Sequence, residues 1–384
     1  MLAVEFLDEL VFGARDAAWP IIRTDLELSY VQIGLLLSMP IVIGTLVEPA
    51  IGILGDVWRR RLLVIIGGVC FTASLVLISF SSNFYILLAA LALFNPSSGV
   101  FVGLSQASLM DSAPLRHEQN MARWTFAGSV GVLLGPLALG LAVTLGMGWR
   151  GMFLALVAVS VVVLFLVSRI AIPKAASGGD DEPRTSFRQA AIAALQALRR
   201  RSVIRWLVLL EFSDLLLDVF NGYLALYMVD VAGVSPAQAA LAVAVWAGAG
   251  LAGGLVVIPL LERVRGLTYL RHSVLASLVV FPAVLLLPDF GWKLVAIALL
   301  GFGNAGWYSV LKGQLYSVLP GQSASVLAIG SVSGLAASLI PLGLGAAATL
   351  WGLDTAMWLL LAGPVVLLVG VARDTRRGDI PNLG

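Results

Sequence analysis

The sequence predicts an all-α membrane protein with twelve transmembrane helices in two six-helix pseudo-symmetric bundles. Three observations predict this fold: the composition, the length of the apolar stretches and an internal repeat. Of 384 residues, 59% are hydrophobic and only 12% are charged, and the mean hydropathy is +0.97. Soluble globular domains do not reach these values. We therefore expect lipid to surround most of the chain.

The apolar stretches are long enough to cross a bilayer, whose hydrocarbon core of roughly 30 Å needs about 20 helical residues. No charged residue lies between Leu62 and Phe80 or between Gly151 and Val167. Charged and turn-forming residues separate the stretches. The predicted spans are 3–22, 30–54, 62–80, 84–109, 121–146, 149–171, 204–229, 236–260, 270–288, 292–318, 323–350 and 353–372.

Lysine and arginine predict the orientation, because positively charged loops stay in the cytoplasm. They gather in alternate loops, on the side that holds both termini, and the opposite loops add little beyond Arg23, Arg150 and Lys293. We expect a multi-pass protein of a prokaryotic plasma or inner membrane with both termini in the cytoplasm. Acidic residues in the first span argue against a cleavable signal peptide, and whether Met1 is the true start stays open.

An internal repeat relates the two halves, since one shift of 206 residues aligns about sixty positions without gaps. The segment Glu5–Asp8 falls on Glu211–Asp214, Ser29 on Ser235, and Gln32 on Gln238. Such a repeat predicts two halves related by a pseudo-two-fold axis along the membrane normal. The predicted parts are an N-terminal bundle at 1–171, a cytoplasmic linker with an amphipathic helix at 172–203, a C-terminal bundle at 204–372 and a cytoplasmic tail at 373–384.

The loop after the second span reads Gly52-Ile53-Leu54-Gly55-Asp56-Val57-Trp58-Arg59-Arg60-Arg61. It resembles the signature loop of the major facilitator superfamily, although one basic residue and one glycine of the usual pattern are replaced. The resemblance to that family covers essentially the whole chain. It implies that Gly52, Asp56, Arg60 and Arg61 act in gating, with the carboxylate at a helix end and the cations as a latch. An arginine cluster that only sets the orientation is the alternative.

The fifth span carries Gly131, Gly135, Pro136 and Gly140. These residues resemble the glycine-proline motif of the superfamily's antiporters, and residues 19–34 resemble the end of the first helix and the next loop in its drug:proton antiporters. Small residues allow close helix packing and proline bends a helix, so the four are predicted gating residues. Packing alone is the alternative. Asn95 replaces an arginine of those antiporters, which weakens any transfer of their coupling mechanism.

Ionisable residues inside a bilayer indicate function, because each costs on the order of 2.5 to 3.5 kcal/mol at a helix centre. Acidic residues form one face of the first span and one face of the seventh. They outnumber the cations, and like charges at low dielectric constant favour protonation of some of them. For Glu5 and Glu9, hydration at the membrane surface is the alternative. The predicted proton-coupling residues are Asp8, Asp16, Glu48, Glu211, Asp214 and Asp218.

Aromatic and polar residues accompany these acids and suit an amphipathic, cationic or zwitterionic ligand through stacking and cation–π contacts. Helix packing is the alternative for each aromatic residue taken alone. Lys312 lies at the depth of Glu211, so we expect it to pair with Glu211 or Asp214. The predicted substrate-binding residues are Arg15, Trp19, Gln106, Asn221, Tyr223, Trp246, Trp307, Tyr308 and Lys312.

These patterns favour a secondary active transporter that exports small amphipathic, cationic or zwitterionic molecules by proton-coupled alternating access. A lipid or lysolipid flippase and a proton-coupled uptake symporter remain alternatives, and sodium remains an alternative coupling ion. Residues 301–306 match a dinucleotide-binding pattern, but they lie in an apolar span without βαβ context. We expect no enzyme activity, catalytic residue, cofactor or metal. The expected partners of the monomer are its substrate, protons and membrane lipid, and no nucleic acid.

Overall fold

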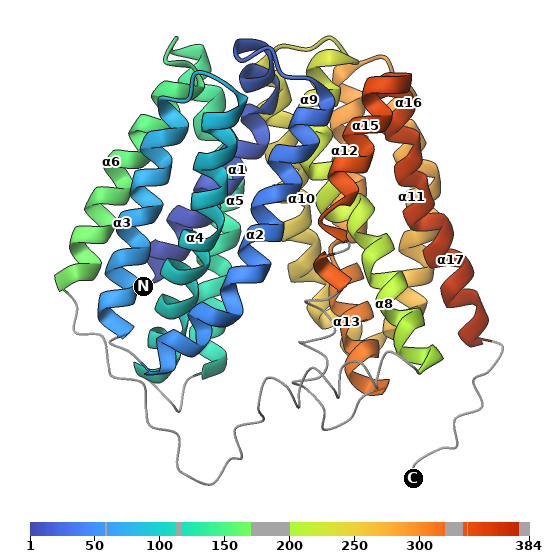
Figure 1. Ribbon diagram of the computed structural model, residues 1–384. Coiled ribbons are helices and arrows are strands. Elements are labelled where there is room, and N and C mark those ends of the chain that lie inside the picture. Colours follow the sequence, from blue (N-terminus) through green and yellow to red (C-terminus); the bar gives the residue numbers. More distant parts are fainter. Residues whose placement is uncertain (58–59, 113–116, 170–199, 319–332, 336, 376–384) are drawn as a thin grey trace, which may run out of the picture. The chain divides into compact units, whose positions relative to one another are not determined.

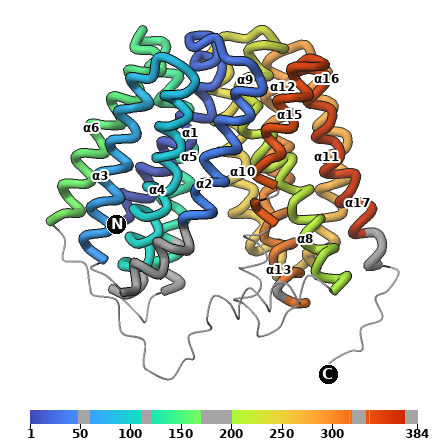
Figure 2. The backbone as a smooth tube through the Cα atoms, in the orientation of Figure 1, coloured from blue at the N-terminus to red at the C-terminus, as the bar shows by residue number. Residues whose placement is uncertain are grey.

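The computed structural model describes residues 1–57, 60–112, 117–169, 200–318, 333–335 and 337–375, and the coloured part of the tube in Figure 2 lies within these ranges. Side chains are described for these residues except 48–57, 110–112, 117–119, 122, 316 and 372–375. The predicted amphipathic helix of the linker and most of the predicted tail lie outside these ranges. The structure therefore positions the membrane helices on which the candidate site depends.

The described residues are helical and contain no strand, which confirms the predicted all-helical fold. Within them, ten helical segments are long and apolar enough to cross a membrane. Helices meet every backbone hydrogen bond internally, as an apolar solvent requires. Two further segments, Leu2–Asp25 and Arg201–Asp230, contain the acidic faces. The predicted count of twelve is therefore only approximate.

The described residues of the first half form six helices, which Figure 1 labels. They are α1 (Leu2–Asp25), α2 (Tyr30–Val57), α3 (Arg60–Ser79), α4 (Phe84–Ser112), α5 (His117–Thr144) and α6 (Gly148–Arg169). Helix α1 packs along α5, while α4 packs against both α2 and α3. Phe71 joins them in the core through ring contacts with Phe94 at 5.0 Å and Phe101 at 5.8 Å between centroids.

The second half contains shorter helices and several interruptions. Its elements are α8 (Arg201–Asp214), the π-helix η2 (Leu215–Val219), α9 (Phe220–Asp230), α10 (Pro236–Arg263), α11 (Gly266–Leu286), α12 (Phe290–Asn304), α13 (Trp307–Val318), α15 (Ile340–Trp351), α16 (Leu353–Met357), the 3₁₀-helix η3 (Trp358–Leu361) and α17 (Ala362–Thr375). The span predicted at 292–318 is thus two helices, because the α-helix stops at Asn304 and resumes at Trp307.

By its internal contacts the chain divides into two compact units. Unit 1 comprises Met1–Arg184, Gly222–Ala247 and Ser338–Leu353. Unit 2 comprises Thr185–Asn221, Gly248–Ala337 and Asp354–Gly384. Helices α9 and α15 therefore belong with the first-half helices. The predicted division into two six-helix bundles follows the sequence repeat and not these units, and it stays a prediction.

Reciprocal capping boxes begin two equivalent helices and give the repeat a structural basis. At the start of α2, the Gln32 amide N–H donates to Ser29 Oγ at 3.2 Å, and the Ser29 N–H donates to Gln32 Oε1 at 2.9 Å. At the start of α10, Gln238 and Ser235 make the same two bonds at 3.2 and 3.0 Å. A Ser-x-x-Gln box satisfies two amides that a helix leaves unpaired at its first turn.

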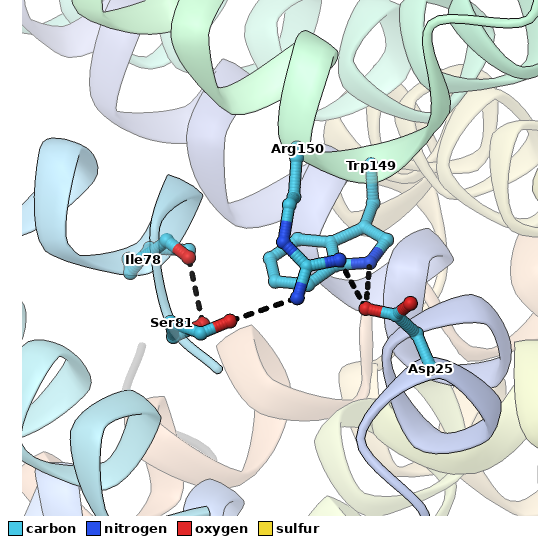
Figure 3. A network of polar contacts seen from close by, with 5 residues as sticks. All are labelled: Asp25, Ile78, Ser81, Trp149 and Arg150. Atoms are coloured by element: carbon cyan, nitrogen blue, oxygen red, sulfur yellow. Dashed lines mark hydrogen bonds and ion pairs between the residues drawn. The ribbon is translucent and has the colours of Figure 1, made fainter. Parts of the chain in front are cut away.

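A polar network joins the end of α1 to α6 and to the residues after α3 (Figure 3). Arg150 donates to Asp25 Oδ2 and, at 2.8 Å, to the Ser81 carbonyl, while Trp149 Nε1 donates to the same Asp25 oxygen at 3.2 Å. The Arg150 guanidinium also lies 4.4 Å from the centre of the Trp149 ring. Arg150 therefore joins three chain segments within unit 1.

Candidate functional site

A buried carboxyl group on α1 is the centre of the polar cluster in unit 1. Asp8 is 5% exposed, and Ser98 of α4 donates a hydrogen bond from Oγ to Asp8 Oδ1 at 2.7 Å. Among the described residues, no cation lies within ion-pair distance of Asp8. The acidic face predicted for α1 therefore contains at least one carboxyl group that is held by a hydroxyl and not by a salt bridge.

Glu5 lies one helical turn away, against α5. A Cβ atom added to Gly128 would lie 2.7 Å from Glu5 Oε1 and 3.3 Å from Glu9 Cγ, so the missing side chain makes room for both acids. Trp124, which lies on α5 like Gly128, is a hydrogen-bonding neighbour of Glu5. The sequence analysis did not identify Ser98, Trp124 or Gly128. Only Gly128 had a signal, since it shares the helical face of Gly131 and Gly135.

Arg15 and Asp16, the next charged residues of α1, neutralise each other. Arg15 donates to Asp16 Oδ1 from Nε at 3.1 Å and from NH2 at 2.9 Å. The guanidinium lies 4.6 Å from the centre of the Phe12 ring, which packs edge-on against Phe94 at 5.3 Å. Both charged side chains are largely buried. The pairing lowers the cost of keeping two charges in an apolar environment.

A second acidic cluster lies in unit 2, on α8 and the π-helix that follows it. Glu211 and Asp214 are half-buried, and Asp218 is exposed. Helix α13 packs against α8, as Figure 1 also shows, and Lys312 of α13 interacts electrostatically with Glu211 and Asp214. No described carboxylate lies within 4.0 Å of the ammonium group, so the predicted direct ion pair is not formed. Ser333 supplies the hydrogen bond to Glu211.

The break between α12 and α13 is held by side chains of α11 one turn apart. Tyr269 Oη donates to the Gly303 carbonyl at 2.7 Å and accepts from the Gly306 amide at 3.1 Å. One turn further, Ser273 Oγ accepts from Trp307 Nε1 at 2.6 Å. The two Tyr269 bonds satisfy backbone groups that an interrupted helix frees inside a membrane. They set the direction of α13 and thereby the position of Lys312.

Most of the aromatic residues predicted to bind substrate lie in the protein core. Trp19 and Trp307 are fully buried, and Trp246 is nearly so. Tyr223 is also fully buried and donates to the Pro341 carbonyl at 2.7 Å. Tyr308 differs, because half of its surface is exposed. A ligand reaches the buried four only if neighbouring side chains move, so their role in binding stays a prediction.

The polar residues predicted to bind substrate are more accessible. Gln106 and Asn221 are partly exposed, and Gln106 Nε2 lies 3.7 Å from the sulfur of Met121. Lys312 is also partly exposed, and its Nζ lies 5.7 Å from the centre of the Tyr308 ring. Tyr308 and Lys312 are therefore the predicted aromatic and cationic contacts that lie together on an accessible face.

The predicted gating glycines of α5 face the backbone of α1. A Cβ added to Gly131 would lie 2.5 Å from the Phe6 carbonyl oxygen, and one added to Gly135 would lie 2.6 Å from the Ala14 nitrogen. Pro136 lies on the same seam: a Cβ on Gly13 would come 3.0 Å from its Cδ, whereas one on Gly140 would meet nothing closer than 3.7 Å. Close packing of two helices explains this stripe. Its role in gating stays a prediction.

The first part of the predicted signature loop, Gly52 to Val57, lies in helix α2, and the loop's side chains are described only at its end. The side chains of Glu48, Gly52 and Asp56 lie outside the described residues. Arg60 is buried, and Arg61 donates from NH2 to the carbonyl of Ser168 at the end of α6 at 2.7 Å. The arginine therefore ties the start of α3 to α6. The described residues contain no group of three or more His, Cys, Asp or Glu side chains arranged for a metal ion.

Comparison with known proteins finds a family match along most of the chain. The Major Facilitator Superfamily model matches residues 1–347. The fosmidomycin resistance protein of Escherichia coli K12 is 25% identical over 318 residues, which cover 79% of this chain and 74% of that protein. A probable actinorhodin transporter of Streptomyces coelicolor is 29% identical over 176 residues, which cover 43% of this chain and 29% of that protein.

Solved structures show the same fold at lower identity. A bacterial homologue of the human lysosomal transporter Spinster, in an inward-facing and occupied conformation, has a TM-score of 0.77 at 15% identity and covers 100% of this chain and 98% of its own. The nucleoside transporter NupG has a TM-score of 0.79 at 14% identity and covers 98% of each chain. The architecture of the described helices is therefore that of transporters.

Proposed function

The chain belongs to the major facilitator superfamily, and on this premise we propose that it exports small amphipathic, cationic or zwitterionic molecules in exchange for protons. As a member of this family it is a multi-pass secondary transporter and not an enzyme. We further infer that it lies in the bacterial inner membrane with both termini in the cytoplasm. Alternating access then takes place between the halves 1–171 and 204–372.

The buried carboxyl group of Asp8 is the observation that carries this proposal. It lies in a membrane helix, accepts a hydrogen bond from Ser98, and has no described cation within ion-pair distance. An unpaired carboxylate in such a place costs several kcal/mol by order of magnitude, and binding a proton removes that cost. A carboxyl group that takes up and releases one proton as its access alternates couples transport to the proton gradient.

Glu211 and Asp214 support the same proposal from the second half. The repeat aligns Glu5 with Glu211 and Asp8 with Asp214, and these four residues lie on the helices α1 and α8. Arg15 pairs with Asp16, which leaves Asp16 less suited to exchange a proton than Asp8. We therefore rank Asp8, Glu211 and Asp214 first among the six predicted proton-coupling residues.

The name of one relative favours export as the direction. One is named for resistance to fosmidomycin, and resistance is what removal of a toxic compound confers. The other is named as a probable actinorhodin transporter. The neighbouring structure named as a nucleoside transporter shares the fold alone, so its name does not indicate direction or substrate for this chain.

The test is transport by the full chain in proteoliposomes with an imposed pH gradient, using cationic, zwitterionic and lipid probes. We expect flux of an amphipathic cation or zwitterion to follow the gradient, and Asp8→Asn to abolish this dependence. Asp289→Asn is the matched control, because Asp289 caps α12 through the Trp292 amide at 3.0 Å and asparagine caps a helix equally well.

Four results would contradict the proposal. Gradient-driven flux that persists in Asp8→Asn would remove Asp8 from the coupling. Flux that follows a sodium gradient and ignores pH would replace the coupling ion. Movement of lipid probes alone would establish the flippase, and accumulation of substrate together with protons would establish the uptake symporter.

A further inference from the structure

Helix α13 has one buried and one accessible face, and the accessible face is polar. Its buried residues are Trp307, Val310, Leu311 and Leu315. Among its described side chains, the exposed or partly exposed residues are Tyr308, Ser309, Lys312, Gly313, Gln314, Ser317 and, at its last position, Val318. Lys312 lies about 9 Å along the helix from the end at Val318. A lysine at that depth avoids hydrocarbon and lines protein or water. The face that carries Lys312 and Tyr308 is therefore suited to a transported molecule.

The ammonium group of Lys312 retains its hydrogen-bonding capacity. No hydrogen bond or ion pair joins it to another residue in the part of the chain that the structure describes. Glu211 and Asp214 lie near enough to interact with its charge, yet Glu211 takes its hydrogen bond from Ser333. Lysine has three N–H donors on a flexible stem. An incoming acidic group can therefore bind Lys312 without first displacing a described ion-pair partner.

Two other basic side chains inside the helical region are already occupied. Arg15 forms its ion pair with Asp16 at 2.9 Å. Lys293 is buried and donates from Nζ to the carbonyls of Val284 and Leu285 at 2.7 and 3.3 Å, at the end of α11. Their charges are used within the fold, and only Lys312 among these three offers a cation to a ligand.

In the first half of the repeat, the position equivalent to Lys312 carries an uncharged residue. Gln106 is the equivalent position in the first half, and its amide nitrogen faces the sulfur of Met121 at 3.7 Å. Packing is similar at the neighbouring equivalent pair, because Phe101 and Trp307 are both fully buried. The scaffold therefore does not require a positive charge at this position, and Lys312 needs a separate explanation.

From these observations we propose that Lys312 binds an acidic group of the substrate, and that Tyr308 packs against a flat organic part of the same molecule. The ring lies one turn before Lys312 and is 50% exposed, with its centre 5.7 Å from Nζ. The substrate class is then an amphipathic zwitterion with a carboxylate-like group, and not a simple cation. This inference rests on the proposed function only in assuming that the site carries a substrate.

Equilibrium binding to the purified full chain tests this without any gradient. The probes are the zwitterionic dye tetramethylrhodamine, which carries a free carboxylate, and its cationic methyl ester, measured by fluorescence anisotropy. We expect the wild type to bind the zwitterion at least about tenfold more tightly, as a charge-assisted hydrogen bond gives. Lys312→Met should lower affinity for the zwitterion by about the same factor and leave the ester unaffected, while Lys312→Arg should keep the preference.

Equal binding of the two dyes by the wild type, preference for the ester, or binding of neither dye would overturn the inference. So would a Lys312→Met variant that keeps the preference or weakens both dyes equally. The wild-type comparison needs no variant, so it stands even if a substitution impairs folding. Wild-type flux that ignores the pH gradient, with the dye preference intact, would overturn the proposed function alone. Wild-type flux that follows the pH gradient, without the dye preference, would overturn this inference alone.

Discussion

Arg23, in the last turn of α1, forms an ion pair with Asp230, the last residue of α9, at 3.0 Å between NH1 and Oδ2. Tyr30, the first residue of α2, donates its hydroxyl to the same carboxylate oxygen at 2.9 Å. The guanidinium lies 4.3 Å from the centre of the Tyr30 ring. The pair joins helices of the first and second halves of the chain within unit 1. A transporter whose halves alternate must break this contact when it opens at this end.

Further along α2 from the Arg23–Asp230 pair, α2 and α15 pack closely against each other. Ser38 Oγ accepts from the Leu342 amide at 3.1 Å, and a Cβ on Gly34 would lie 2.7 Å from the Leu342 Cα. Asp230→Asn removes the ion pair but keeps an acceptor for Tyr30. We expect the contact to open more often, by about fivefold for an ion pair worth about 1 kcal/mol. The measurement is thiol labelling of Ser38→Cys in a chain whose Cys70 is replaced by alanine.

Tyr30→Phe is the matched variant for that measurement, because it keeps the stacked ring and loses only the hydroxyl. It should increase labelling less than Asp230→Asn does. Labelling of Ser38→Cys at the wild-type rate in Asp230→Asn would show that the ion pair does not hold α2 against α15.

The network around Asp25 predicts a loss of stability on removal of Arg150 (Figure 3). Arg150→Ala leaves the Ser81 carbonyl and the Asp25 carboxylate without their arginine donor. The side chains are more than a third exposed, so we expect a modest loss of roughly 1 kcal/mol in the free energy of unfolding. Arg150→Lys should lose less, because it keeps the charge without the planar fork. Thermal unfolding in detergent measures both, and equal melting temperatures for all three proteins would contradict the prediction.

The close packing of the α5 glycines Gly131 and Gly135 against α1 predicts that one added methyl group pushes the two helices apart. Gly135→Ala places a Cβ 2.6 Å from the Ala14 nitrogen, so the helix backbones must move apart. We expect a loss of about 1 to 3 kcal/mol, as for other overpacked sites. Gly254→Ala in α10 is the control, since its added Cβ would meet nothing within 4 Å and alanine favours a helix. A melting temperature lowered equally by both substitutions would refute the seam as the cause.

The hydrogen bonds of Tyr269 in α11 are expected to stabilise the break between α12 and α13. Tyr269→Phe removes the hydroxyl that pairs with the Gly303 carbonyl and the Gly306 amide. Leaving such buried groups unpaired costs about 1 to 3 kcal/mol. Hydrogen exchange should show reduced protection at Gly306, with a lower melting temperature. Tyr85→Phe, which alters an exposed tyrosine of α4, should change neither. Unchanged protection at Gly306 in Tyr269→Phe would mean that other groups hold the break.

The candidate site could be predicted only in part. The repeat and the cost of buried charge identified Asp8, Glu211 and Asp214 as residues of interest, because both depend on local sequence. They did not identify Ser98, which lies 90 positions from Asp8 along the chain. The sequence also predicts Trp19 as a substrate contact, and only the structure shows that its side chain is fully buried. A helical wheel shows which residues share a face, but not which neighbouring helix covers it.

The all-helical class and most of the membrane spans follow from the sequence alone, because each depends on residues within a few turns of one another. Tertiary structure alone decided the partner of Asp8, the pairing of Arg23 with Asp230, and the division of one predicted span at Asn304. In that break, Tyr269 supplies the hydrogen bonds that the helix gives up. Such partners come from distant segments, so only packing in an apolar solvent, where polar groups must be paired, selects them.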